Sequence, residues 1–316
     1  MALSKPIEIS LHEDEPLFRE AVLYTARKTG LNAALVEKDY FCSVLLADLC
    51  SGCKLPPVFR GGTCLSKIHA DFYRLSEDLD FTISLSAAAS RSDRSRMITP
   101  VKEWISALGK ESSVFKMEQK LTGFNNSKQY VAQVAYPTLV GSGLGRIKIE
   151  VGLREEILVP PVKGSVRTLL ENPFTSMPGV EEFEIVVLTR EETYAEKLRA
   201  ALTRREPAIR DFYDIDYAVS RLGVNLEDPH LVGLLKRKLQ VPDNDEIDIS
   251  IARKKELLSQ LETQLKPVLR SSDYDMFDFE RAFRMIADLA RMIAGQAWQK
   301  DTLCPKRFLN EQPPAR

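Results

Sequence analysis

Histidine and cysteine are scarce in this sequence, and their scarcity limits both disulfide and zinc chemistry. The 316 residues include three histidines and five cysteines. An odd, unevenly spread set of cysteines does not make a disulfide framework in a chain of this size, so we expect reduced thiols. Cys50 and Cys53 have the spacing of half a zinc site, but His12, His69 and His230 lack the spacing of the other half. Structural zinc is therefore not predicted.

Long apolar runs and a large excess of either charge are also missing. No stretch approaches the roughly eighteen apolar residues that cross a bilayer, and the first residues lack the apolar core of a signal peptide. We expect a cytoplasmic protein without a membrane partner. The net charge is −1, with 28% charged and 44% hydrophobic residues. This composition is typical of a globular protein and argues against a surface that coats nucleic acid broadly.

The residues with recognisable chemistry gather in the segment 58–83. A short strand-like run there is followed by Gly61 and Gly62, and apolar residues then recur at helical spacing. A glycine turn of this kind can bring backbone amides close to an anion at the start of a helix. Thr63 adds a hydroxyl that could bind a phosphate oxygen or cap the helix. A simple turn is the alternative interpretation of Gly-Gly-Thr alone.

Two aspartates follow in a second strand-like run. Asp78 and Asp80 stand two residues apart, so in a strand their carboxylates project from the same face into one pocket. Like charges that close are costly unless a cation neutralises them, and oxygen ligands suit Mg²⁺ (or Mn²⁺) bridged to substrate phosphates. An isolated Asp-x-Asp is more often a solvated strand end. The order of glycine turn, helix and aspartate strand favours the metal and nucleotide site.

A later strand supplies a candidate third carboxylate. The segment 146–151 alternates strictly between charged and apolar residues, which places Lys148 and Glu150 on one face. Glu150 is the candidate to hold metal and accept the proton of an attacking hydroxyl. Lys148 is interpreted either as a phosphate contact or as the ion-pair partner of Glu150. A solvated strand face is the alternative for both.

The arrangement resembles the nucleotidyltransferase superfamily that includes DNA polymerase beta. More closely, Phe-Arg-Gly-Gly-Thr-Cys-Leu-Ser-Lys at 59–67 and Arg-Leu-Ser-Glu-Asp-Leu-Asp-Phe at 74–81 resemble the AbiEii/AbiGii family, the toxins of type IV toxin–antitoxin and abortive-infection systems. Within that resemblance Lys67 is a charge neutraliser near the nucleotide. Cys64 departs from the small or apolar residue expected there, and a glutamate stands where the third carboxylate is expected as aspartate.

A second block, in a helical region, agrees with the same family. Ala-Glu-Lys-Leu-Arg-Ala at 195–200 precedes Arg-Asp-Phe-Tyr-Asp at 210–214. The resemblance implies that Lys197 contacts the triphosphate and that Asp211 completes the site, with Asp214 and Arg210 in support. The plain alternative is an amphipathic helical hairpin with its charges in water.

We expect an α/β (α+β) fold with a polymerase-beta-like core and a mixed sheet. Residues 1–188 are predicted to form the nucleotidyltransferase core with N-terminal helices, and 189–316 a helical domain that opens with a Thr189–Glu192 capping box. The basic clusters at 236–238 and 253–255 are interpreted as solvated faces, with phosphate contacts to an RNA acceptor as the alternative. The other predicted elements are helices at about 13–48, broken at Gly30, a helix at 91–108, strands at 114–119, 130–136 and 184–188, an irregular connection at 159–179, and helices over 228–309.

The resemblance implies a metal-dependent nucleotidyltransferase. It would move a nucleoside monophosphate from an NTP to an acceptor hydroxyl, with the 3′ end of tRNA as the favoured acceptor and a cognate antitoxin as a partner. The alternatives are a protein or small-molecule acceptor, or a nucleotide-binding interaction module without turnover. Ser76 lies two residues before Asp78, so its phosphorylation would repel the nucleotide, which is a hypothesis about regulation.

Overall fold

A mixed sheet forms the centre of the computed structural model, which describes residues 11–112 and 114–298. Within those residues the sheet has seven strands in the order β3-β4-β5-β2-β1-β7-β6. The pairs β1–β7 and β2–β5 are parallel and the others are antiparallel. The predicted mixed α/β sheet is therefore confirmed. The strands are β1 (Val58–Arg60), β2 (Leu79–Thr82), β3 (Lys116–Phe124), β4 (Gln129–Pro137), β5 (Leu144–Gly152), β6 (Val162–Val166) and β7 (Phe183–Val187).

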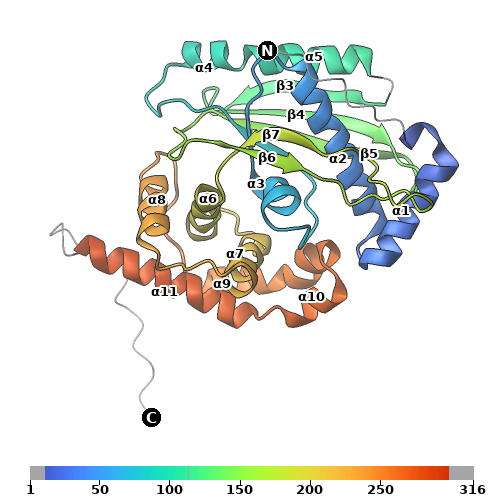
Figure 1. The fold of residues 1–316 in the computed structure, drawn as a ribbon. Helices are drawn as coiled ribbons and strands as arrows, with labels where there is room; N and C mark the ends of the chain where they lie inside the picture. The colour runs from blue at the N-terminus through green and yellow to red at the C-terminus, as the bar shows by residue number, and fades with distance from the viewer. Residues whose placement is uncertain (1–10, 113, 299–316) are drawn as a thin grey trace.

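Helices flank the sheet in two groups (Figure 1). The first group is α1 (Glu15–Thr29), α2 (Ala33–Gly52), α3 (Gly61–Cys64), α4 (Arg91–Met97) and α5 (Thr99–Glu111), with a π-helical turn η2 (Leu65–His69) directly after α3. The second is α6 (Arg190–Thr203), α7 (Ile209–Leu222), α8 (Pro229–Leu239), α9 (Ile251–Ser259), α10 (Ser271–Met276) and α11 (Phe279–Trp298). In Figure 1 the second group gathers below the sheet and α4 and α5 run above it. No helix in the described ranges combines the length and the apolarity that a bilayer span requires.

The helix breaks follow local chemistry. Gly30 ends α1 with φ +71°, the left-handed conformation that glycine adopts without steric cost, as the sequence predicted. The single helix predicted at 91–108 is wrong, because the structure has two helices joined at Ile98. Pro100 lies in the first turn of α5, where its missing N–H is harmless, whereas a continuous helix could not use that proline.

One face of the sheet is apolar and the other carries the candidate site. Glu150, Asp80 and Arg60 are neighbours in register across β5, β2 and β1, so their side chains share a face. The opposite face packs on α1, α2 and α5 in the first hydrophobic core. Strand β5 contributes Ile147, Ile149 and Val151 to that core, each fully buried.

Strand β6 corrects the prediction of an irregular connection over 159–179. It pairs antiparallel with β7 at the edge of the sheet. An edge strand covers little apolar surface, and most of its side chains here are exposed or half-buried, so it lacks the alternation that signals a strand. The prolines at 160 and 161 stand just before it, where a missing N–H costs no sheet hydrogen bond.

A second hydrophobic core lies among α6 to α11. It includes Leu198, Phe212 and Ile286, and it also takes in Leu65 and Tyr73 from the segment after the glycine turn. The helical region therefore packs directly on that segment. The helices predicted from 228 onward are confirmed as far as Trp298, and the part predicted at 299–309 lies outside the described residues. The proposed domain boundary at 188/189 stays a prediction.

Candidate active site

The glycine turn, Gly61 and Gly62 at the start of α3 directly after β1, is fixed by close contacts. Gly61 has φ +79°, and a Cβ placed there would collide with the carboxylate of Asp80. A Cβ on Gly62 would lie 2.8 Å from both Nη2 of Arg74 and Oγ of Ser76. Both positions therefore need glycine, the first for its backbone conformation as well. The predicted order of turn, helix and aspartate strand is confirmed.

Three carboxylates meet beside this turn. Asp80 on β2 pairs in register with Glu150 on β5, and Asp78 stands just before β2. All three line the same cleft. Nζ of Lys148 lies 3.1 Å from Oε2 of Glu150 and 3.8 Å from Oδ2 of Asp78. The sequence thus placed these four residues correctly relative to one another, while their roles stay a prediction.

The positive charges near the three carboxylates do not fully offset burial and mutual repulsion at Asp80. Burial, followed by the charges of Glu150 and Asp78, raises the pKa of Asp80 to about 6, although Arg60 and Lys148 act in the opposite direction. Oxygen donors short of positive charge are the ligands that Mg²⁺ or Mn²⁺ prefers. In the described part of the chain no three acidic, histidine or cysteine side chains stand ready to hold a metal ion. The carboxylate oxygens of Asp78, Asp80 and Glu150 are suitable donors for such an ion. In this structure the ammonium of Lys148 is the cation beside Asp78 and Glu150.

The cleft has a volume of about 1190 Å³ and lies between the sheet face and the helices α6 and α7. Its floor carries the carboxylates and the glycine turn. Its helical side carries five basic residues, Lys197, Arg199, Arg204, Arg205 and Arg210, together with acidic and neutral ones, and Arg154 after β5 adds a sixth positive charge. Negative and positive side chains therefore face each other across one opening, as a phosphorylated substrate with a cation would require.

Lys197 lies at the centre of the helical wall. Its Nζ is 2.8 Å from Oδ1 of Asp211 and 2.9 Å from Oδ2 of Asp214. Asp214 is fully buried and also accepts hydrogen bonds from Nε and Nη2 of Arg74 and from the Tyr73 hydroxyl. This network ties α6 and α7 to the segment that follows the glycine turn. The structure therefore brings the two predicted blocks together.

These groups remain charged at neutral pH. Burial alone would lower the pKa of Lys197, but the Asp211 and Asp214 carboxylates outweigh it and raise that pKa. Burial would raise the pKa of Asp211, yet Lys197 and Arg204 hold it below its ordinary value. Arg204 is the arginine that pairs with Asp211, at 3.2 Å, and the supporting role expected of Arg210 stays a prediction.

Lys67 does not reach the cleft, although the resemblance placed it near the nucleotide. It is fully buried, and its Nζ lies 2.7 Å from Oδ1 of Asp39 and 2.7 Å from Oγ of Ser43. The π-helical turn η2 carries it toward α2, on the other side of the glycine turn. Lys67 therefore fastens this segment to α2, and Asp39 is a residue that the sequence interpretation missed.

Thr63 also differs from both of its predicted uses. Its hydroxyl donates a hydrogen bond to the backbone oxygen of Asp78 at 2.5 Å, and it neither caps α3 nor lines the cleft. The side chain is buried. Thr63 therefore links the glycine turn to the backbone just before β2, which positions the Asp78 carboxylate rather than a phosphate.

Arg60 is a second residue that sequence interpretation missed. It faces Asp80 across β1 and β2, and its Nη1 lies 2.9 Å from Oε2 of Glu196 on α6. Both side chains line the cleft. Arg60 immediately precedes the glycine turn and Glu196 immediately precedes Lys197, so their positions beside the motifs were a usable signal.

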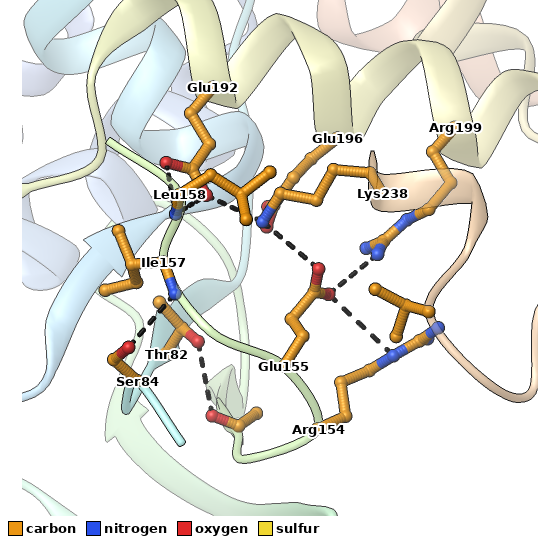
Figure 2. Close-up of polar contacts among 12 residues, drawn as sticks. Thr82, Ser84, Arg154, Glu155, Ile157, Leu158, Glu192, Glu196, Arg199 and Lys238 are labelled. Carbon is orange, nitrogen blue, oxygen red and sulfur yellow. Dashed lines mark hydrogen bonds and ion pairs between the residues drawn. The ribbon is translucent and has the colours of Figure 1, made fainter. Parts of the chain in front are cut away.

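A buried ionic cluster supports this side of the cleft. Figure 2 shows Glu192, Glu196 and Arg199 projecting from α6 toward Glu155, with Lys238 among them. Nζ of Lys238 lies 2.7 Å from Glu192 and 3.1 Å from both Glu155 and Glu196. The prediction of a solvated basic face at 236–238 is therefore wrong for Lys238, which is 1% exposed.

The predicted capping box at the start of α6 is only half correct. The hydroxyl of Thr189 accepts a hydrogen bond from the backbone N–H of Glu192, as expected. The Glu192 carboxylate does not return to the cap and instead accepts a hydrogen bond from the backbone N–H of Leu158 (Figure 2). It also accepts one from the backbone N–H of Val159. Its ion pair with Lys238 outweighs the local capping contact.

The glycine turn, the Asp-x-Asp strand, the adjacent glutamate strand and Lys197 all line one cleft, which is the arrangement that the resemblance to nucleotidyltransferases implies. The chain belongs to the AbiEii family, described as nucleotidyl transferase AbiEii toxin of type IV toxin–antitoxin systems, whose family model matches residues 44–288. It is accordingly a nucleotidyltransferase of a toxin family.

Other comparisons add little. No curated protein matches the chain. JHP933 from Helicobacter pylori is similar in structure at 17% identity and TM-score 0.44, covering 85% of this chain and 96% of its own. A candidate nucleotidyltransferase from H. pylori is similar at 16% identity and TM-score 0.41, covering 82% of this chain and 96% of its own. Similarity at this level carries no argument about the site.

Proposed function

We propose that this protein transfers a nucleoside monophosphate from an NTP to an acceptor hydroxyl in a reaction that needs Mg²⁺ or Mn²⁺, and that the acceptor is the 3′ end of tRNA. The observation that carries the proposal is the register of Asp80 with Glu150, with Asp78 beside them, on the cleft face next to the glycine turn. The family's type IV toxin–antitoxin description supports an antitoxin as a partner. The cytoplasm as the place of action is part of the proposal.

Asp78, Asp80 and Glu150 would hold the divalent cation. When bound, such a cation withdraws electron density from phosphate oxygens and favours deprotonation of a nearby hydroxyl. Glu150 accepts the proton of the acceptor hydroxyl while the oxygen of that hydroxyl forms a bond to the α-phosphorus. The bond from that phosphorus to the β-phosphate oxygen breaks, and pyrophosphate leaves.

Residues of the turn and the helical wall complete the reaction. The backbone of Gly61 and Gly62 allows close approach of the triphosphate, since no Cβ intervenes. Lys197 and Lys148 offset the negative charge that grows on the leaving pyrophosphate. Asp211 and Asp214 hold the Lys197 ammonium in place and keep it protonated. Lys67 and Thr63 stabilise the glycine turn without contacting the substrate, Lys67 through its ion pair with Asp39 and Thr63 through its hydrogen bond to the Asp78 backbone.

The size of the cleft supports an acceptor larger than a small molecule. Sites for a single small ligand enclose about 300–1,000 Å³. The cleft here, at about 1190 Å³, exceeds that range. It has room for an acceptor beside the NTP, and its arginines suit a phosphorylated one.

Transfer can be tested with labelled nucleotides. The purified protein is incubated with total tRNA, Mg²⁺ and each α-labelled NTP in turn. Asp80→Asn is the inactive variant, and Asp275→Asn, which changes an exposed aspartate on α10, is the matched control. Label on tRNA with the wild type and Asp275→Asn, but not with Asp80→Asn, is the expected result. Label on protein alone would show that the acceptor is a protein and not tRNA. Nucleotide binding without any transfer would favour the alternative of a nucleotide-binding interaction module without turnover.

Regulation at Ser76 is part of the proposal. Ser76 lines the cleft beside Gly62, so a phosphate on its hydroxyl would repel the triphosphate. We expect Ser76→Asp to abolish transfer and Ser76→Ala to retain it. Full activity of Ser76→Asp in the same labelling assay would remove Ser76 as a regulatory site.

A further inference from the structure

Arg210 differs from every other basic side chain that lines the cleft. Each of the others forms an ion pair, as Arg60 does with Glu196 and Lys197 with Asp211. The Arg210 guanidinium has neither an ion pair nor a hydrogen bond with any residue in the described ranges. It is nevertheless half-buried, as the second residue of α7. A half-buried charge without a partner is costly, because it gives up water and gains nothing in return.

The acidic residue that follows Arg210 in the sequence is already paired with other cations. Asp211, the next residue, is 2% exposed and is held by Lys197 on Oδ1 and by Arg204 on Oδ2. Glu206 and Glu256 also line this end of the cleft, but both are exposed and neither pairs with Arg210. The guanidinium therefore faces open cleft next to a carboxylate that cannot neutralise it.

The surroundings favour an anion with several oxygens. Arg204 lies on the same wall with about half of its side chain exposed, so it can contact a ligand while it keeps its ion pair with Asp211. The first turn of α7 adds a positive field, because Ala208 provides no side-chain cap for it. A planar guanidinium matches phosphate oxygens with two parallel hydrogen bonds.

We infer that Arg210, with Arg204 beside it, forms a second phosphate subsite at the helical end of the cleft, separate from the carboxylates and the glycine turn. This inference rests on the proposed nucleotidyl transfer. The phosphate has two possible sources, the terminal phosphate of the NTP or a backbone phosphate of a polynucleotide acceptor. Arg210 is a substrate-binding residue in either case.

Binding measurements separate the two sources without relying on turnover. The first arm measures the affinity of each NTP with Mg²⁺ by calorimetry, and the second follows 5′-fluorescein-labelled tRNA by anisotropy over a series of NaCl concentrations. Arg210→Gln should weaken one of the two ligands about tenfold. If the ligand is tRNA, the slope of log affinity against log NaCl concentration should also become shallower by about one released ion. Arg210→Lys should restore the wild-type slope.

The controls make the result decisive. Arg19→Gln changes an exposed arginine on α1, outside the cleft, and should alter neither affinity. Arg210→Gln should keep the wild-type unfolding midpoint, because no internal ion pair is lost. Wild-type affinity of Arg210→Gln for both ligands would overturn the subsite and leave the proposed function intact. A wild type that binds neither NTP nor tRNA would overturn the proposed function itself.

Discussion

At the scale of single residues, a motif identifies a side chain but not its direction. Lys67 and Lys197 both stand in family-like blocks, yet Lys197 reaches the cleft and Lys67 is buried against Asp39. The sequence could not separate them, because the difference depends on the π-helical turn η2 and on a contact with α2. The shared side of Asp78 and Asp80 was predictable from their spacing of two residues, whereas the place of Glu150 beside them depends on the pairing of β2 with β5.

The first prediction concerns those two lysines. Lys67→Met leaves the buried Asp39 carboxylate without its cation, so we expect a loss of about 3–5 kcal/mol in unfolding free energy. The KM for NTP should stay near the wild-type value in the fraction that folds. Lys197→Met should instead reduce kcat for transfer. Urea unfolding and steady-state kinetics of the two variants measure these effects, and a large rise in KM for folded Lys67→Met would contradict the placement of Lys67.

The second prediction concerns pH. Burial opposes ionisation of Asp214, but Arg74 and Lys197 prevail and hold its pKa well below the ordinary 3.8. A depressed pKa stabilises the fold above the unfolded-state pKa, and this stabilisation is lost as pH falls below about 4. Asp214→Asn should therefore cost about 3 kcal/mol at pH 7. The difference from the wild type should shrink below pH 4 in urea titrations, and a constant difference from pH 7 to 3 would refute this origin.

At the scale of elements, periodic segments were predictable and contact-dependent ones were not. Helix α1 and strands β4 and β5 carry their burial patterns in the sequence. Strand β6 does not, because its formation depends on the neighbouring β7 rather than on its own side chains. The turn at Gly61 was recognisable from its residues, but the need for glycine there comes from the Asp80 carboxylate, which only the pairing of β1 with β2 brings close.

The third prediction compares two glycines with similar backbones. Gly61 and Gly223 have φ of +79° and +67°, but a Cβ on Gly223 would meet nothing within 4 Å. Gly223→Ala should cost about 1–2 kcal/mol of stability through backbone strain and leave transfer intact. Gly61→Ala adds the collision with Asp80, so it should cost more and abolish NTP binding. Equal activity of the two variants would show that the turn at Gly61 does not serve the nucleotide.

At the scale of the whole molecule, two buried polar networks join the sheet to the helical region. One is Arg74 with Asp214, and the other is Lys238 with its three glutamates (Figure 2). The overall α/β class followed from the sequence, whereas these networks did not, since each joins residues far apart in the chain. Their shared effect is to fix the width of the cleft by charge rather than by apolar packing alone.

The fourth prediction tests that connection. Lys238→Met removes the cation from among Glu155, Glu192 and Glu196, and we expect a loss of about 3–5 kcal/mol in unfolding free energy. Protection from hydrogen exchange should fall in α6 and α8 together, with α1 and α2 unaffected. A conservative control is Lys236→Met, on the same helix but half-buried rather than buried. Equal losses for the two variants would argue against the cluster as the connection.

Lys148 lies between Asp78 and Glu150 and supplies positive charge at the place where the proposed reaction would need a divalent cation. If a cation were held by both carboxylates, it would compete with this ammonium for them. Lys148 would then be available to contact the triphosphate. Metal and nucleotide should therefore bind cooperatively, each weakly alone, and the enzyme would sequester neither when the other is absent.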